Sequence, residues 1–86
     1  MSPETRILNS KKDQPTLEEA QAFVGGYIEI VTTRKGEQIV INEEGKLQGL
    51  PWNDLATDLA HEGGAISSDD YIAGNCMILV GKARLD

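Results

Sequence analysis

Histidine and cysteine are nearly absent from this sequence, since each occurs once, as His61 and Cys76. A single cysteine excludes an internal disulfide, which is typical of proteins kept in a reducing compartment. A zinc site needs several His or Cys ligands, and a nucleophilic cysteine needs a base beside it. Because Cys76 opens an apolar run typical of a buried strand, we expect no catalytic residue, no metal and no cofactor.

Long hydrophobic runs are also missing, because the longest, Cys76 to Val80, is far short of the roughly 20 residues that span a bilayer. Residues 1–6 contain no apolar segment of the kind found in signal peptides. We therefore expect a cytoplasmic protein without membrane contact. A chain of 86 residues corresponds to one domain. We expect residues 1–15 to be flexible or to form an edge strand, and residues 16–86 to form a single α+β domain.

Basic residues are in short supply, with 8 Lys and Arg against 14 Asp and Glu, a net charge of −6. Contact with a phosphate backbone requires a basic face, so we expect no direct binding of nucleic acid. The acidic surface either serves solubility alone or faces a basic protein partner. The apolar content of 40% is that of an ordinary globular domain.

Two segments have the signals of helices. Thr16 followed by Glu19 forms a capping box, apolar residues continue at helical spacing, and Gly25-Gly26 ends the helix. Pro51 or Asn53 marks the start of a second helix, which Gly63-Gly64 ends. Its apolar stripe at helical spacing comprises Trp52, Leu55, Ala56 and Leu59.

Strand signals occupy most of the remaining chain. Residues 27–33, 37–42 and 46–50 predict a three-stranded antiparallel meander with glycine-containing turns. Residues 71–82 predict a last strand, interrupted near Gly74. Because residues 76–80 are apolar throughout, this strand should be central in the sheet. The predicted fold class is α+β: an antiparallel sheet of four or five strands with one or two short helices packed on one face.

Two polar segments, residues 42–46 and 50–53, contain most of the candidate binding residues. Asn42 and Asn53 can hydrogen-bond a ligand, or each can fix a turn or a helix start. Trp52 is either the first core residue of the second helix or an interface anchor, together with Tyr27 or Tyr71. If functional, these segments would form a shallow polar pocket at the edge of the meander, floored by Trp52. The candidates are Asn42, Glu43, Glu44, Lys46, Trp52, Asn53, Asp54 and Asp58.

Four blocks of sequence, at residues 24–29, 42–46, 49–57 and 72–75, read VGGYIE, NEEGK, GLPxNxxAT and IxGN. In this order and spacing they resemble a family of small domains of unknown function, encoded mostly by bacteriophages, plasmids and other mobile elements. The resemblance covers about residues 16–82. It implies a phage or mobile-element origin in a bacterial cytoplasm, and it implies no reaction. Trp52 departs from the family pattern, in which a smaller or more variable residue is expected.

These observations lead to a first hypothesis, a non-enzymatic accessory protein of a phage or mobile element that binds a host protein, such as a defence or regulatory factor. The alternative is a protein that binds or sequesters a small nucleotide signal, as a homo-oligomer with sites between subunits. That alternative requires basic side chains to converge. An enzyme ranks last. The basic residues concerned are Arg34, Lys35, Lys46, Lys82 and Arg84.

Overall fold

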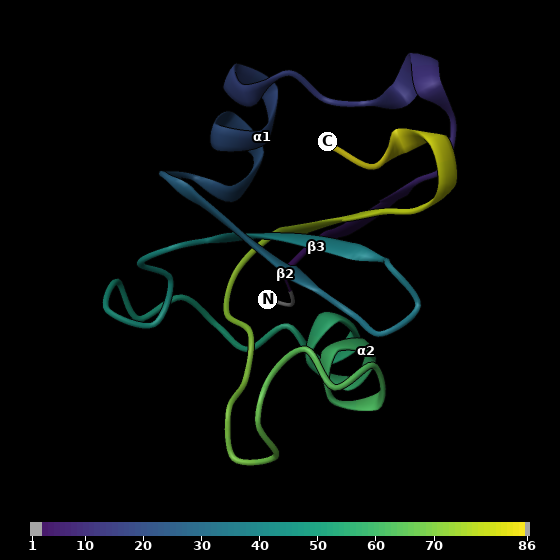
Figure 1. Ribbon diagram of the computed structural model, residues 1–86. Helices are drawn as coiled ribbons and strands as arrows, with labels where there is room; N and C mark the ends of the chain where they lie inside the picture. Colours follow the sequence, from purple (N-terminus) through teal and green to yellow (C-terminus); the bar gives the residue numbers. More distant parts are fainter. Residues whose placement is uncertain (1–2, 86) are drawn as a thin grey trace.

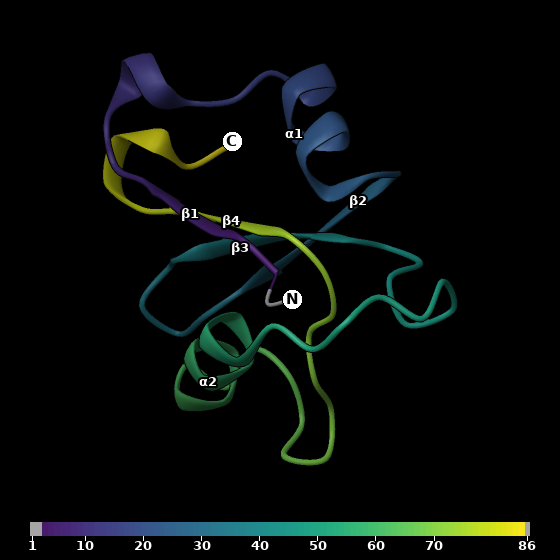
Figure 2. The ribbon, with the colours of Figure 1, turned by 180° about the vertical axis from the view of Figure 1, so that it is seen from behind.

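The computed structural model describes residues 3–85 of the chain, which form a four-stranded sheet with an α-helix on each face (Figures 1 and 2). The predicted α+β class is confirmed. The strands are β1 (Thr5–Leu8), β2 (Ile28–Thr32), β3 (Gln38–Asn42) and β4 (Cys76–Leu79). The helices are α1 (Leu17–Val24), α2 (Asp54–Glu62) and two short 3₁₀ turns, η1 (Lys11–Asp13) and η2 (Gly81–Ala83).

The sheet has the strand order β1-β4-β3-β2 and is mixed rather than wholly antiparallel. β2 and β3 form an antiparallel hairpin, and β3 pairs antiparallel with β4. β1 pairs in parallel with β4, in a register that joins Thr5 to Cys76 and Leu8 to Leu79. The expectation of an antiparallel sheet is therefore wrong at this edge. A parallel pair needs a long crossover, and here the whole chain between the first and last strands supplies it.

β4 is buried at all four positions and lies between β1 and β3, which confirms its predicted central place. Its side chains alternate between two cores. Met77 and Leu79 pack with the buried side of α1, whereas Cys76 and Ile78 pack with that of α2. The two helices therefore cover opposite faces, and the prediction of helices on one face is wrong. A strand that is apolar at every position needs cover on both sides, because alternate side chains point in opposite directions.

The start and end of α1 follow the sequence signals. The Thr16 hydroxyl accepts a hydrogen bond from the backbone N–H of Glu19, and the Glu19 carboxylate accepts one from the N–H of Thr16. Gly25 ends the helix in the left-handed conformation, at φ 84°. Ala20 and Val24 are the buried residues of this helix. The predicted capping box and glycine end are confirmed.

The segment predicted as a third strand of the meander, residues 46–50, is not a strand. Residues 43–49 instead form successive turns, in which the N–H of Gln48 donates to the carbonyl of Glu44 and that of Leu50 to the carbonyl of Gly45. These local bonds bend the chain away from β3. As a result, the meander is reduced to the β2–β3 hairpin, and the Leu47 side chain is 85% exposed.

The residues that α2 buries differ from the apolar stripe predicted for the second helix. The buried residues of α2 are Ala56, Thr57 and Ala60. Trp52 precedes the helix and is 57% exposed, and Leu55 is 56% exposed. The interpretation of Trp52 as a core residue is therefore wrong. The apolar residues that α2 buries are thus small, and they join the core that contains Ile39, Cys76 and Ile78.

Candidate binding surface

Trp52 and Tyr71 are stacked on the surface, with ring centroids 4.2 Å apart and ring planes 5° from parallel. Of the two tyrosines considered as companions for Trp52, the structure thus pairs it with Tyr71. The exposed Leu55 follows shortly after Trp52 in α2. We call Trp52, Leu55 and Tyr71 the aromatic patch. Offset or parallel stacking of this kind stabilises the two rings in one orientation.

Backbone hydrogen bonds determine that Trp52 points outward. The N–H of Asn53 donates to the carbonyl of Ile72 at 2.8 Å, and the N–H of Gly74 donates to the carbonyl of Pro51 at 2.8 Å. Between them, Trp52 and Ala73 form an antiparallel bridge. Because neighbouring side chains on extended backbone point to opposite sides, Asn53 is buried and Trp52 is exposed.

The Asn53 side chain is engaged within the protein. Its carbonyl oxygen accepts a hydrogen bond from the N–H of Ala56 at 3.0 Å, which caps α2. Its amide nitrogen donates to the carbonyl of Gly74 at 3.0 Å and contacts the Thr5 hydroxyl at 2.8 Å. The predicted role at a helix start is therefore observed, and the residue is only 2% exposed.

Asn42 is likewise committed to the fold. Its amide nitrogen donates to the carbonyl of Val24 and to the side-chain oxygen of Gln48, both at 3.1 Å. Its side-chain oxygen accepts a hydrogen bond from the N–H of Glu44 at 2.8 Å. Asn42 thus fixes the turn that it begins, whereas the side chains of Glu43 and Glu44 are exposed to solvent.

A groove of about 550 Å³ lies where the polar pocket was expected. The β2 and β3 side chains Val31 and Ile41 border it, as do Lys46, Leu47 and Tyr71. Trp52 does not line this groove, so the expectation that it forms the floor is wrong. Trp52 instead stacks on Tyr71, which joins the groove to the aromatic patch.

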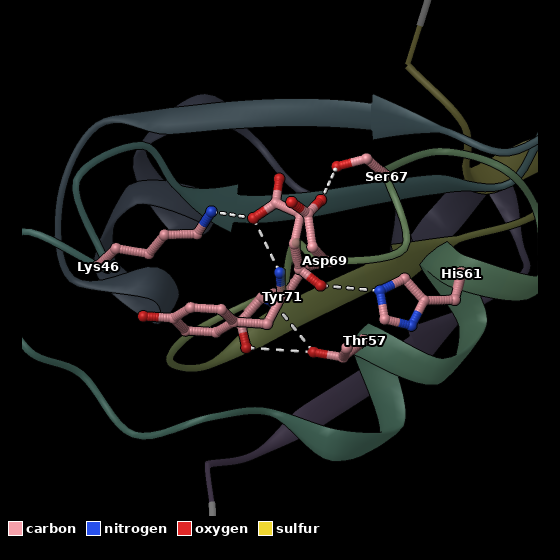
Figure 3. A network of polar contacts seen from close by, with 8 residues as sticks. Lys46, Thr57, His61, Ser67, Asp69 and Tyr71 are labelled. Atoms are coloured by element: carbon pink, nitrogen blue, oxygen red, sulfur yellow. Dashed lines mark hydrogen bonds and ion pairs between the residues drawn. The ribbon is translucent and has the colours of Figure 1, made fainter.

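A polar network holds Tyr71 in place (Figure 3). Lys46 forms an ion pair with Asp70, and its ammonium group lies 5.0 Å from the centre of the Tyr71 ring. The N–H of Tyr71 donates to the Asp70 carboxylate at 2.8 Å. His61 of α2 donates from Nε2 to the Asp70 carbonyl, 2.7 Å away. The hydrogen bond from Lys46, followed by that from Tyr71, lowers the pKa of the Asp70 carboxyl.

Carboxylates border the aromatic patch on its α2 side. Asp54 and Asp58 are both exposed and stand one turn apart on the helix. Trp52, Asp54 and Leu55 line one small hollow of about 240 Å³. The candidates Trp52 and Asp54 therefore share one hollow, Asp58 stands one turn further along α2, and Lys46 is linked to Trp52 through Tyr71.

The family of the chain follows from a match over residues 2–84 to the model described as domain of unknown function DUF3846. The chain belongs to this family. Comparison with curated proteins finds no match, and comparison with solved structures finds none. The resemblance to a family of domains of unknown function is thereby confirmed.

In this DUF3846 domain the polar residues of the quoted blocks mainly support the fold. Asn75 accepts a hydrogen bond from the N–H of Glu4 at 2.8 Å and donates to the carbonyl of Phe23 at 3.3 Å. Together with Asn42 and Asn53, it joins distant segments. Sequence reasoning missed Asp70 as a neighbour of the binding candidates, because only the pairing of residues 51–53 with 72–74 brings its segment to Trp52. Leu55 was assigned to the buried stripe of the second helix, and the structure exposes it.

Cys76 and His61 do not form a nucleophilic pair. Cys76 is fully buried in β4 and its thiol donates to the carbonyl of Gly74 at 3.3 Å. Burial raises the pKa of the Cys76 thiol to about 12. Over residues 3–85, no group of three or more His, Cys, Asp or Glu side chains is placed to hold a metal ion. The helices of the same residues are too short and too polar to cross a membrane.

The basic residues named for nucleotide binding fall into separate groups. Lys46 is paired with Asp70 beside the groove. Arg34 packs against Gly64, beyond the end of α2. Lys35 and Arg84 line one hollow, which lies beside the β2–β3 turn. Lys82 and Arg84 line a second, adjoining hollow.

Proposed function

We propose that this DUF3846 protein is a cytoplasmic accessory protein of a phage or mobile element that binds a host protein through the aromatic patch. The sequence resemblance supports the origin. The observation that supports binding is the exposure of Trp52 (57%) and Leu55 (56%) next to the acidic side chains of α2. Trp and Tyr are the residues most enriched among interface anchors.

The backbone bridge to Ala73 turns Trp52 outward, and the exposed surface of its ring contributes no burial to the isolated domain. Burying apolar surface stabilises a protein by roughly 25 cal/mol per Å², and a large ring that is more than half exposed forgoes much of that gain. The α2 helix reaches its full burial through Ala56 and Ala60, without the indole. An exposed ring beside an exposed leucine is a surface suited to a partner.

The patch is also held rigidly. Trp52 is fixed by its backbone bridge to Ala73 and by stacking on Tyr71. Tyr71 is in turn tied to Asp70, Lys46 and α2 through the polar network. A preordered anchor loses little conformational entropy when it binds, so this arrangement favours affinity.

Charge indicates the chemistry of the partner. Asp54 and Asp58 border the patch, and the chain as a whole carries a net charge of −6. A partner with an apolar pocket rimmed by Lys or Arg would be complementary in shape and charge. Attraction between such surfaces raises the rate of association and weakens as salt concentration rises.

Site-specific photocrosslinking in the native bacterial host tests the proposal. A photoreactive amino acid replaces Leu55 in one variant and Leu17 in a matched control. Leu17 is 59% exposed on α1, which covers the opposite face of the sheet. We expect a discrete host protein to be crosslinked from position 55 and not from position 17. Equal crosslinking from both positions, or none, would contradict the proposal.

A substitution provides the second half of this test. Trp52→Ala should abolish the crosslink from position 55, while Tyr27→Ala should leave it intact, because Tyr27 is 68% exposed but outside the patch. Loss of the stacked pair should cost only about 1 kcal/mol of unfolding free energy. Circular dichroism of the purified Trp52→Ala variant should therefore show a folded domain.

A further inference from the structure

Four of the eight basic side chains of this acidic chain lie at one end of the sheet. Lys11 lies on η1, Lys35 in the β2–β3 turn, Lys82 on η2, and Arg84 just after η2. Figures 1 and 2 both show η1 (purple) and η2 (yellow) side by side. We call these four residues the basic end; it is separate from the aromatic patch.

Two adjoining hollows lie at the basic end. The larger, of about 690 Å³, is lined by Lys11, Lys82 and Arg84, with Gln38 and the backbone of Gly81 and Leu85. The smaller, of about 370 Å³, is lined by Lys35 and by Glu37. Gly81 and Arg84 border both hollows. Volumes of this size are in the range of small-molecule sites.

The Arg84 guanidinium is held by backbone carbonyls. Nε donates to the carbonyl of Gly81 at 3.1 Å and Nη1 to that of Gly36 at 3.4 Å. A guanidinium has more N–H donors than these two carbonyls use. The remaining donors keep a defined orientation, and no carboxylate among residues 3–85 forms an ion pair with this guanidinium.

The chain around Arg84 is clamped to the rest of the domain. The carbonyl of Arg84 accepts a hydrogen bond from the Gln14 side chain at 2.6 Å. Gln38 bonds the backbone of Leu85 twice, through its amide nitrogen at 2.8 Å and its oxygen at 2.6 Å. The two glutamine side chains thus fix the backbone of Arg84 and Leu85 before any ligand binds. This preordering lowers the entropic cost of binding.

The four cations have no ion-pair partner among residues 3–85, where the ion pairs are Arg6 with Glu4 and Lys46 with Asp70. Like charges gathered without counter-charges repel one another. The Glu37 carboxylate, which lines the smaller hollow, accepts a hydrogen bond from the Thr33 hydroxyl at 3.0 Å. It borders the smaller hollow, whereas the charged side chains of residues 3–85 that line the larger hollow are Lys11, Lys82 and Arg84.

We propose that the basic end binds a phosphorylated ligand, with Arg84 as its main contact and Lys11 and Lys82 completing the larger hollow. A guanidinium can donate two parallel hydrogen bonds to a phosphate, and lysines add point charges. Because Arg84 borders both hollows, the site suits a ligand that carries more than one phosphate group. Such groups occur in nucleoside polyphosphates and in nucleic acid backbones.

Isothermal titration calorimetry of the full chain tests this site. The three probes are pyrophosphate, a nucleoside triphosphate and a short single-stranded oligonucleotide. We expect saturable binding that weakens as salt concentration rises, because ion contacts are screened. Arg84→Gln should raise the Kd about tenfold, the effect of losing a charge-assisted hydrogen bond. Lys82→Gln repeats the test at an exposed side chain that forms no hydrogen bond within residues 3–85. The Lys82→Gln result therefore decides the test if Arg84→Gln disturbs the fold.

Arg6→Gln is the matched control, because it removes one positive charge from β1, where Arg6 contacts Glu4 and Phe23. Binding that is unchanged in Arg6→Gln and weakened in Lys82→Gln supports the site. Equal weakening in both, or no saturable binding of any probe, overturns it. If the oligonucleotide binds more tightly than the triphosphate, the ligand is a nucleic acid backbone; the reverse order identifies a small nucleotide.

Discussion

Buried asparagines join parts of this domain that are distant in sequence. Asn53 connects α2 with β1 and with the loop before β4, and Asn42 connects the turn after β3 with the end of α1. Each side-chain amide bonds groups on segments that lie far apart in the sequence. At the scale of single residues, these side chains therefore act as structural ties rather than as ligand contacts.

Replacing Asn53 by Ala should lower the free energy of unfolding by about 2–3 kcal/mol. The change removes the cap of α2, worth about 1 kcal/mol, and leaves the carbonyl of Gly74 buried without that partner. Urea denaturation of the purified protein measures the loss. Asn9→Ala, at an exposed position, is the control and should be nearly neutral. A loss under 0.5 kcal/mol at Asn53, on the order of a neutral surface change, would contradict this role.

At the scale of elements, one network connects the 43–49 turns, the loop before β4 and α2. Lys46 and His61 both bind Asp70, the first through its carboxylate and the second through its carbonyl. The Thr57 hydroxyl of α2 accepts a further hydrogen bond, from the N–H of Ile72 at 2.9 Å. The orientation of Tyr71, and through it that of Trp52, depends on this junction.

The lowered pKa of Asp70 makes part of the stability depend on pH. Because the folded pKa lies below the unfolded value of 3.8, the ion pair stabilises the fold above 3.8. This stabilisation is lost as the pH falls through the folded pKa. Since the pair is partly exposed, it contributes under about 1 kcal/mol.

Thermal unfolding scanned below pH 5 measures that loss. Asp70→Asn should flatten the pH dependence, and Asp69→Asn should not. Within residues 3–85, the Asp69 carboxylate accepts a hydrogen bond from the Ser67 hydroxyl at 2.8 Å and forms no ion pair. Identical slopes for the two variants would show that the pair with Lys46 contributes nothing.

The burial of small α2 side chains in the core beneath that helix is a second property of this scale. Ala56 and Ala60 are completely buried against Ile39, Cys76 and Ile78. Ala60→Leu should therefore destabilise the domain by about 1–3 kcal/mol, because the helix has no space for a longer side chain. Glu62→Leu on the exposed side of α2 is the matched control in guanidinium denaturation. Equal midpoints for the two variants would mean that α2 is more loosely packed than the structure shows.

The whole molecule is a three-layer arrangement in which β4 is the shared centre. Its neighbours are strands on both sides and a helix core on each face. Any exposure of β4 therefore requires the two cores to separate from the sheet. We expect the domain to unfold as one cooperative unit, which is usual for a chain of this size.

Cys76 reports on that cooperativity. At a pH below 9.0 the thiol should resist a disulfide reagent in the folded protein, because it is buried and its pKa is raised to about 12 by desolvation. Labelling under increasing urea should follow the same transition as circular dichroism. Labelling that precedes the loss of secondary structure would reveal local opening of β4. As the pH rises from 9.0 toward about 12, the free energy of unfolding should also decline, because only the unfolded thiol ionises.

Local signals in the sequence determined much of the fold. The Thr16–Glu19 capping box, the glycine end of α1, the β2–β3 hairpin and the central place of β4 all follow from interactions within a few residues or from continuous apolarity. These features depend on backbone chemistry and side-chain periodicity, which a sequence displays directly. The membership of a family of domains of unknown function was also recognisable from sequence.

The tertiary structure alone decided how the first and last strands pair and which candidate residues form a common surface. The parallel pairing of β1 with β4 joins residues 5–8 with 76–79, and no local signal specifies a partner that far away. The stack of Trp52 on Tyr71 and the gathering of Lys11, Lys35, Lys82 and Arg84 likewise depend on packing between distant segments. Sequence identifies which side chains can act, whereas long-range packing determines which of them lie together.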